Sequence, residues 1–152
     1  ESIIFLFYFV RFLAPLAQRI PGDPEGQAQV ARGEELFGAL GCTGCHVPVL
    51  ETGSHPVEAL SERAVAFYSD FLLHDLGPEL VGVCGPGASP TEHRTGILMG
   101  VGQRDLYLHS GDATSLEEAI LRHGGEAERA REAFRALSEV DRYYLIRFLE
   151  SL

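Results

Sequence analysis

The stretch "GALGCTGCHVP" constrains this chain more than any other, because it sets Cys42 and Cys45 in a C-x-x-C spacing directly before His46. Two thiols at this spacing can form thioether bonds to the edge of a haem, and the adjacent imidazole can bind the iron from one side. A chain with this motif folds around the group it carries. The motif therefore predicts one covalently bound haem c, held by Cys42, Cys45 and His46.

Other sites that use a C-x-x-C pair fit the surrounding sequence less well. A structural zinc ion needs four ligands, and Cys84 alone does not supply the missing pair. A thioredoxin-like redox pair follows a strand and needs no histidine, whereas a helix is predicted before this motif. A chance disulfide or a metal knuckle is the remaining alternative to haem c. Once haem takes two thiols, Cys84 is unpaired, and we expect a buried bystander ahead of an intermolecular disulfide or an attachment point.

The size and charge of the chain describe one acidic domain. Its 152 residues, 45% of them hydrophobic, can bury one core around a cofactor. The net charge of −10 argues against nucleic acid as a partner and would attract a basic redox protein, although solubility alone explains it equally well. We expect a single domain over 1–152, with an apolar helix at 1–17 and a haem-binding core at 23–152. Thioether attachment of haem takes place outside the cytoplasm, which predicts a periplasmic or extracytoplasmic location.

The opening segment "SIIFLFYFVRFLAPLA" is apolar on all sides through Val10, and Arg11 and Pro15 then interrupt it. It is shorter than the roughly 20 residues that span a membrane, and it lacks the basic start of a signal peptide. Such a helix is buried either in this chain or against another subunit or lipid. The partners we expect are other redox proteins or haem subunits, or further copies of this chain. Lipid contact through residues 2–14 stays open, but no membrane span is expected.

Two more helices are predicted, one before the motif and one at the end of the chain. Asp23 can cap the first, with Pro24 at its first helical position, and Gly33 lets another helix cross it closely. Its apolar contacts are Val30, Leu36, Phe37 and Leu40. Ser138 can cap the last helix, whose apolar face is predicted to comprise Val140, Tyr144, Phe148 and Leu152.

A helix leading into a haem motif, crossed by a helix that ends the chain, resembles the framework of class I cytochromes c. Residues 47–57 and 78–108 are rich in Gly and Pro and are expected to be mostly loops. We therefore predict an all-α, class I cytochrome c-like domain with crossed terminal helices, long loops and an extra N-terminal apolar helix.

A haem iron also has a second axial position, and an open one permits peroxide or gas chemistry whereas a filled one favours electron transfer. The candidates for that position are Met99, His55, His74, His93, His109 and His123. His123 is favoured because Ser115 and Glu118 have capping-box spacing for a helix whose apolar face would include His123. Met99, the sole methionine, is the alternative, since a thioether can bind haem iron.

The other polar residues near these motifs receive more modest predictions. His55 and His93 are expected in polar, solvent-facing loops, and His74, next to Asp75, as a supporting or packing group. Arg94 can pair with a haem propionate, because guanidinium matches the geometry of a carboxylate, or it is a plain surface charge.

Several separated segments together resemble one protein family. They are "RGEELFGALGCTGCHVPVLETG", "FYSDFLLHDLGPEL", "EHRTGILMGVG" and "YLHSGDATSLEEAILRHGGEAERAREAFRALS". In this order they resemble the C-terminal haem domain of bacterial di-haem oxidoreductases of the thiol oxidoreductase-like type, relatives of di-haem cytochrome c peroxidases. The resemblance covers nearly the whole chain and implies a haem-binding redox domain.

The resemblance also bears on the second axial ligand. In the peroxidase relatives a "YxHDG" segment lies fourteen positions before the distal ligand of this haem, which is commonly methionine. Here "YLHSG" contains His109, and His123 stands fourteen positions later. The thiol oxidoreductase-like branch carries histidine there, in a similar "HGGEA" setting. The resemblance thus implies His123, the residue that the helical pattern favours.

This sequence departs from that family in having one C-x-x-C-H motif where its members resemble two fused haem domains. The peroxidase-type mechanism needs two haems, so the enzymatic activity does not follow from the resemblance. The favoured function is a monohaem c-type cytochrome that transfers electrons as a subunit of a larger redox complex or oligomer. The alternative is the haem domain of a peroxidase- or oxidase-like enzyme, whose distal ligand dissociates or whose partner haem domain lies on another chain.

Overall fold

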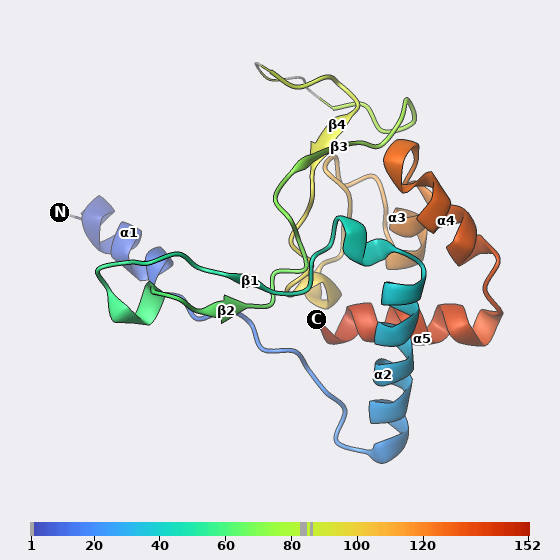
Figure 1. Cartoon of the computed structure of the whole chain (residues 1–152), viewed down its shortest axis with the longest axis horizontal. Helices are drawn as coiled ribbons and strands as arrows, with labels where there is room; N and C mark the ends of the chain where they lie inside the picture. The colour runs from blue at the N-terminus through green and yellow to red at the C-terminus, as the bar shows by residue number, and fades with distance from the viewer. Residues whose placement is uncertain (1, 83–84, 86) are drawn as a thin grey trace.

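The computed structural model describes residues 2–82, 85 and 87–152 of the chain. Its centre is the crossing of two helices, α2 (Pro24–Ala39) and α5 (Glu139–Ser151), as Figure 1 shows. Gly33 lies at the crossing, where a Cβ atom would come within 2.1 Å of the Tyr144 carbonyl oxygen and 2.6 Å of Phe148 Cβ. Because glycine has no side chain, the two backbones can touch, which confirms the predicted close crossing.

Both crossing helices begin at the predicted caps. Asp23 accepts a hydrogen bond from the Gly26 N–H at 2.7 Å, and Ser138 accepts one from the Asp141 N–H at 3.1 Å. The four apolar residues predicted to pack from α2 and its C-terminal end are all buried: Val30, Leu36, Phe37 and Leu40.

The predicted apolar face of α5 is partly wrong. Val140 is 57% exposed, and the buried residues towards the helix end are Leu145, Phe148, Leu149 and Leu152. The reason is geometric: a row of every fourth residue drifts around a helix that has 3.6 residues per turn. The start of the predicted row therefore faces water while its end faces the core.

A further pair of helices packs beside this crossing. They are α3 (Leu116–Leu121) and α4 (Glu128–Arg135), joined through the 3₁₀ turn η4 (Gly125–Ala127). Ser115 caps α3 as predicted and accepts from the Glu118 N–H at 3.0 Å, while the Glu118 carboxylate accepts from the Thr114 N–H. Phe134 of α4 is 1% exposed and joins the core cluster that α2 and α5 form.

Two short antiparallel ribbons correct the all-α prediction to a mostly helical one. Strand β1 (Leu50–Glu51) pairs with β2 (Ala64–Val65), with the turn η2 (Glu58–Leu60) between them, and β3 (Leu73–Asp75) pairs with β4 (Glu92–Arg94). A last turn, η3 (Val101–Gln103), packs against α5. Both ribbons lie in or beside the segments predicted as loops. The architecture is consistent with a cytochrome c-like fold.

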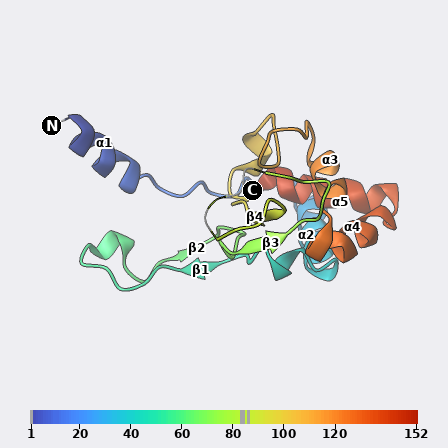
Figure 2. The same ribbon diagram turned by 90° about the horizontal axis from the view of Figure 1, so that it is seen from above.

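Helix α1 (Ser2–Arg11) stands away from the body, on the side to which the β1–β2 hairpin also extends (Figures 1 and 2). It ends at Arg11 rather than at residue 17, and no regular element follows before α2. None of its residues is buried, and Ile3 and Phe5 are 83% and 73% exposed. The prediction that this helix is buried in its own chain is therefore wrong. Within the described residues, no helix has both the length and the apolar character needed to cross a membrane.

Candidate haem-binding site

The C-x-x-C-H motif lies where α2 ends. Gly41 follows the helix with a left-handed backbone, φ +84°, and the 3₁₀ turn η1 (Cys42–Gly44) comes next. The His46 N–H donates to the Cys42 carbonyl at 2.9 Å and closes the turn. Since glycine adopts positive φ at little cost, Gly41 allows the helix to stop and the two thiols and the imidazole to gather on one short loop.

Both cysteines of the motif are free thiols in the structure, so they do not form the alternative disulfide. Burial raises the pKa of Cys42 to about 11 and also raises the pKa of Cys45. A thioredoxin-like pair works through a thiolate whose pKa is lowered. The raised values therefore argue against that chemistry, while leaving the thiols positioned for thioether bonds.

His46 is held by a backbone carbonyl from a distant segment. Its Nδ1–H donates to the Tyr68 carbonyl oxygen at 2.9 Å. A neutral imidazole that donates from Nδ1 carries its lone pair on Nε2, which is the atom a metal would bind. Burial lowers the pKa of His46 and so favours this neutral form.

The segment that supplies this carbonyl is fixed alongside the residues of the motif. The N–H groups of Tyr68, Ser69 and Asp70 donate to the carbonyls of Pro48, Val47 and Cys45 at 3.2, 3.0 and 2.9 Å. Ser69 is fully buried, and its hydroxyl donates to the Thr95 carbonyl at 2.9 Å. The sequence analysis gave this segment no role in the site. It positions the imidazole because it runs beside the residues that include and follow the motif.

His123 also donates its Nδ1–H to a backbone carbonyl. It lies just beyond α3, which ends at Leu121, and its Nδ1–H donates back to the Ala119 carbonyl at 2.7 Å. Its Nε2 is therefore the atom with the free lone pair. Burial lowers the pKa of His123, which again favours the neutral ring. The ring is half-buried, and the helix stops two residues before it, earlier than the pattern suggested.

Burial is the main cause of the lowered pKa of His46, and the charge of His123 lowers it further. Two neutral histidines that each carry the lone pair on Nε2, next to a pair of free thiols, are the donor set that a covalently attached haem requires. The residues present thus fit a haem c. The haem would be bonded to Cys42 and Cys45 and would have His46 and His123 as axial candidates.

The other predicted residues differ in exposure and contacts. Met99 is half-buried, and Arg94 is exposed on β4. His55 and His93 are half-buried rather than solvent-facing: His55 contacts the Arg11 guanidinium, and His93 donates to the Leu80 carbonyl at 3.0 Å. His109 is exposed. Cys84 lies outside the described residues.

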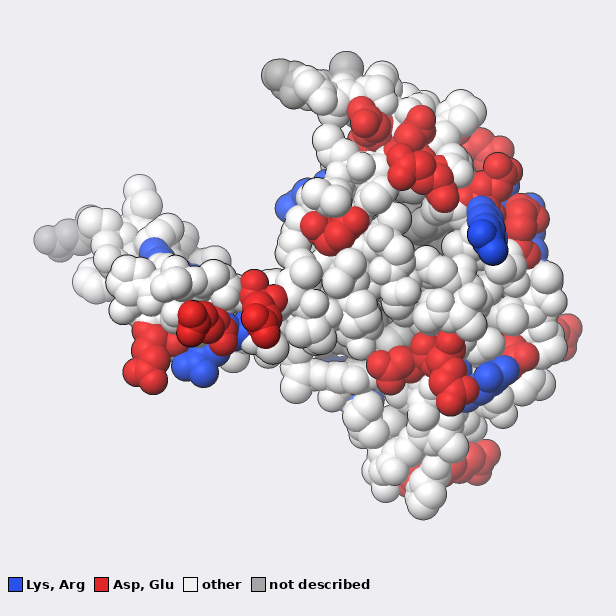
Figure 3. Space-filling model, in the orientation of Figure 1, with Lys and Arg blue, Asp and Glu red and all other residues white. Residues whose placement is uncertain are grey.

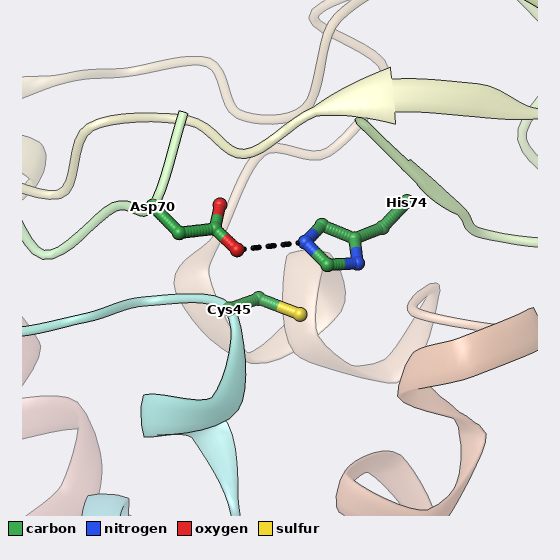
Figure 4. A group of neighbouring side chains, drawn as sticks. All are labelled: Cys45, Asp70 and His74. Carbon is green, nitrogen blue, oxygen red and sulfur yellow. Dashed lines mark hydrogen bonds and ion pairs between the residues drawn. The ribbon is translucent and has the colours of Figure 1, made fainter. Parts of the chain in front are cut away.

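A cluster that the sequence analysis did not identify lies beside Cys45. The Cys45 sulfur, a carboxylate oxygen of Asp70 and a ring nitrogen of His74 lie within 4.8 Å of one another (Figure 4). His74 Nε2 is 2.9 Å from Asp70 Oδ2, and its Nδ1 is 2.9 Å from Glu126 Oε2. Asp75, which follows His74 in the sequence, is not a hydrogen-bond partner of the ring among the described residues. Sequence spacing gave no signal for Glu126, which comes from a turn 52 residues later.

The ionisable groups of this cluster shift one another's pKa values. Hydrogen bonds to Glu126 and then to Asp70 raise the pKa of His74, and the bond to His74 lowers the pKa of Glu126. Burial opposes ionisation of Asp70, but hydrogen bonds from the Leu72 N–H, Thr95 and His74 outweigh it and lower the pKa of this carboxyl to about 2. Both carboxylates thus favour the protonated form of His74.

Comparison with solved structures finds a likeness to a chain of Kuenenia stuttgartiensis hydrazine synthase, determined under xenon pressure. The TM-score is 0.60 at 20% sequence identity, over 97% of this chain and 54% of that chain. This chain thus spans about half the length of that relative, and at this identity the likeness is one of fold. Comparison with the curated proteins finds no match.

A family model described as "Di-haem oxidoreductase, putative peroxidase" matches residues 5–152. The matched range includes both cysteines of the motif, His46 and His123. The family implies a haem cofactor, in agreement with the donor set that the fold assembles. This chain belongs to the di-haem oxidoreductase family.

Proposed function

We propose that this chain is a monohaem c-type cytochrome that transfers electrons, with haem c bonded to Cys42 and Cys45 and ligated by His46 and His123. The observation that carries the proposal is that both imidazoles make the same hydrogen bond. Each gives its Nδ1–H to a backbone carbonyl, at 2.9 Å for His46 and 2.7 Å for His123, and so keeps Nε2 available for iron.

Ligation on both sides favours electron transfer over peroxide chemistry, because peroxide must reach the iron to react. The bound haem would supply the one-electron couple. The chain would hold both ligands in place through backbone hydrogen bonds, which limits the rearrangement that accompanies a change of iron charge. Two imidazoles also set a lower reduction potential than an imidazole and a thioether.

The test is the visible spectrum and reduction potential of the haem protein with substitutions at the proposed distal ligand. His123→Met should keep a six-coordinate haem and raise its potential, whereas His123→Ala should leave it five-coordinate or let a substitute ligand bind. Met99→Leu is the matched control and should change neither property. Low-spin spectra that persist in both His123 variants, but not in Met99→Leu, would assign the ligand to the methionine.

A haem enzyme of the peroxidase or oxidase type is the second candidate, because the family description names a peroxidase. It requires a distal ligand that dissociates or a partner haem domain, since this sequence has one C-x-x-C-H motif. Cyanide discriminates between the two. Immediate cyanide binding by the ferric protein, with high-spin absorption beforehand, supports the enzyme; slow or absent binding supports the carrier.

We further propose that the domain works outside the cytoplasm and within an assembly of redox proteins, haem subunits or copies of itself. The supporting feature is α1, where eight consecutive large apolar residues, Ile3 to Val10, are each at least 52% exposed. A contiguous apolar surface of this kind marks an interaction site. Electrons could then pass to a neighbouring haem without diffusion of the carrier.

A further inference from the structure

His74 has chemistry that the proposed electron transfer does not yet use. Both of its ring nitrogens face carboxylates, at 2.9 Å from Asp70 Oδ2 and 2.9 Å from Glu126 Oε2. An ionised carboxylate only accepts hydrogen bonds, and a neutral imidazole has a single N–H. A neutral His74 would therefore leave a lone pair facing a carboxylate oxygen. The protonated ring donates to both, so the cluster is built to bind a proton.

The position of the cluster places that proton next to the haem attachment. Cys45 Sγ lies within 4.8 Å of a carboxylate oxygen of Asp70 and a ring nitrogen of His74, and Figure 4 shows the sulfur beneath the pair. A thioether at Cys45 would join this sulfur to the edge of the haem. The side chains of His74 and Asp70 are only 17% and 13% exposed, so water screens their charges weakly.

The cluster also has a connection to solvent and a fixed geometry. The Glu126 side chain is 55% exposed, so protons can reach His74 from water along this carboxylate. The Asp75 N–H donates to the second oxygen of Glu126 at 3.0 Å and holds it against the ring. The cluster is therefore a stable acceptor that can still exchange protons.

We propose that His74 is a proton-binding site coupled to the haem, which takes up one proton when the haem is reduced and releases it on oxidation. The inference rests on the proposed electron transfer. One electron passes from an external one-electron reductant to the iron, and one proton passes from water to the His74 imidazole. No other bond forms or breaks, and the net charge of the site is unchanged. An added electron favours the imidazolium, and by linkage the imidazolium favours the reduced haem.

Other ionisable groups around His74 leave this role to the histidine itself. Asp75 lies on the same strand, His93 pairs with His74 across the β3–β4 ribbon, and the Cys45 sulfur would be in the thioether. Arg131 from α4 is paired with Glu128 and Glu132. Within the described residues, the partners that hydrogen-bond to the ring are the two carboxylates, both with lowered pKa values, so they stay ionised where His74 titrates.

The test is the midpoint potential of the intact haem protein, followed by spectroelectrochemistry from acid to alkaline pH. One proton per electron predicts that the potential falls by about 59 mV for each tenfold drop in proton concentration, over a range above the ordinary histidine pKa. His74→Gln should make the potential independent of pH there while the low-spin spectrum is unchanged. His55→Gln, which removes a histidine near the far end of the β1–β2 hairpin, is the matched control and should keep the slope.

A reversible couple with no pH dependence, or a slope that survives in His74→Gln, overturns the inference and leaves the proposed function standing. Absence of a reversible one-electron couple overturns the proposed function, and the inference with it. If His74→Gln does not hold haem, Glu126→Gln provides the second variant. It removes the largest cause of the raised pKa of His74, so the sloping range should move to lower pH, and an unmoved range contradicts the inference.

Discussion

At the scale of single residues, backbone carbonyls decide what His46 and His123 can do. Tyr68 and Ala119 each supply one oxygen, and each oxygen fixes a ring by its Nδ1–H. Tyr68 lies in the left-handed region, φ +51°, which is costly for a bulky residue. The surrounding hydrogen bonds hold it there, so its carbonyl can point at His46. The same principle gives His74 a different role, because its partners are carboxylates.

Asp70 gives a prediction about acid stability. Its pKa of about 2 in the folded protein lies below the ordinary value of 3.8, so the folded state binds fewer protons than the unfolded state. The stabilisation is fully present above about pH 4 and is lost as the pH falls toward 2. Asp70→Asn should therefore lower the thermal midpoint at neutral pH and flatten its decline in acid. Calorimetry of the haem protein measures this.

Asp105→Asn is the control for that experiment, because Asp105 is exposed and lies outside the cluster. It should leave the pH profile close to that of the unsubstituted protein. An Asp70→Asn variant with an equally steep acid decline would show that other carboxylates cause the loss of stability.

At the scale of elements, the crossing of α2 and α5 carries the site. Phe37, one turn after Gly33, has its ring 5.4 Å from that of Phe148, 6.0 Å from that of Tyr68 and 6.3 Å from that of His46. The closeness of the two helices therefore sets the distance between the core and the His46 imidazole. A change that separates the helices should loosen the haem site as well as the core.

Gly33→Ala tests this coupling. The new Cβ would come within 2.1 Å of the Tyr144 carbonyl oxygen, so the helices must move apart, and we expect a loss of about 3 kcal/mol in unfolding free energy. Gly38→Ala in the same helix is the control, since nothing lies within 4 Å of its Cβ and alanine should gain up to about 1 kcal/mol. Denaturant unfolding, followed by haem absorbance, measures both. Equal stabilities for the two variants would contradict a tight crossing.

At the scale of the whole molecule, the body and the projecting α1 differ in what surrounds them. The body is strongly acidic on the face shown in Figure 3, with arginines interspersed, as expected of a solvated surface. Helix α1 is apolar on every side and lacks a partner among the described residues that would bury it. One chain thus combines a water-compatible domain with an element that requires another apolar surface.

Phe9→Glu tests whether α1 mediates assembly. Phe9 is 64% exposed, so the substitution should leave the haem spectrum and thermal midpoint of the body unchanged while it reduces association. The native mass, measured by light scattering with and without mild detergent, reports the result. Val140→Glu, at a 57% exposed apolar position on α5, is the control and should associate normally. A soluble monomer before any substitution would contradict the assembly proposal.

The sequence by itself determined the features that depend on neighbouring residues. The C-x-x-C-H motif sits on contiguous positions, so its haem chemistry needs no knowledge of the fold. The caps at Asp23, Ser115 and Ser138 were predictable because a cap bonds to an N–H two or three residues away. Gly33 was informative for a related reason, since a glycine inside a helix lowers its stability unless something packs against it.

Only the tertiary structure decided which distant groups meet. The carbonyl that orients His46 comes 22 residues later, and the carboxylate of Glu126 reaches His74 across 52 residues. The exposure of α1 also emerged only in three dimensions, because the core that α2 and α5 form closes without it. Sequence patterns encode preferences over one or two turns of backbone. The partner of a buried polar side chain depends instead on which segments packing brings together, and that is a property of the whole chain.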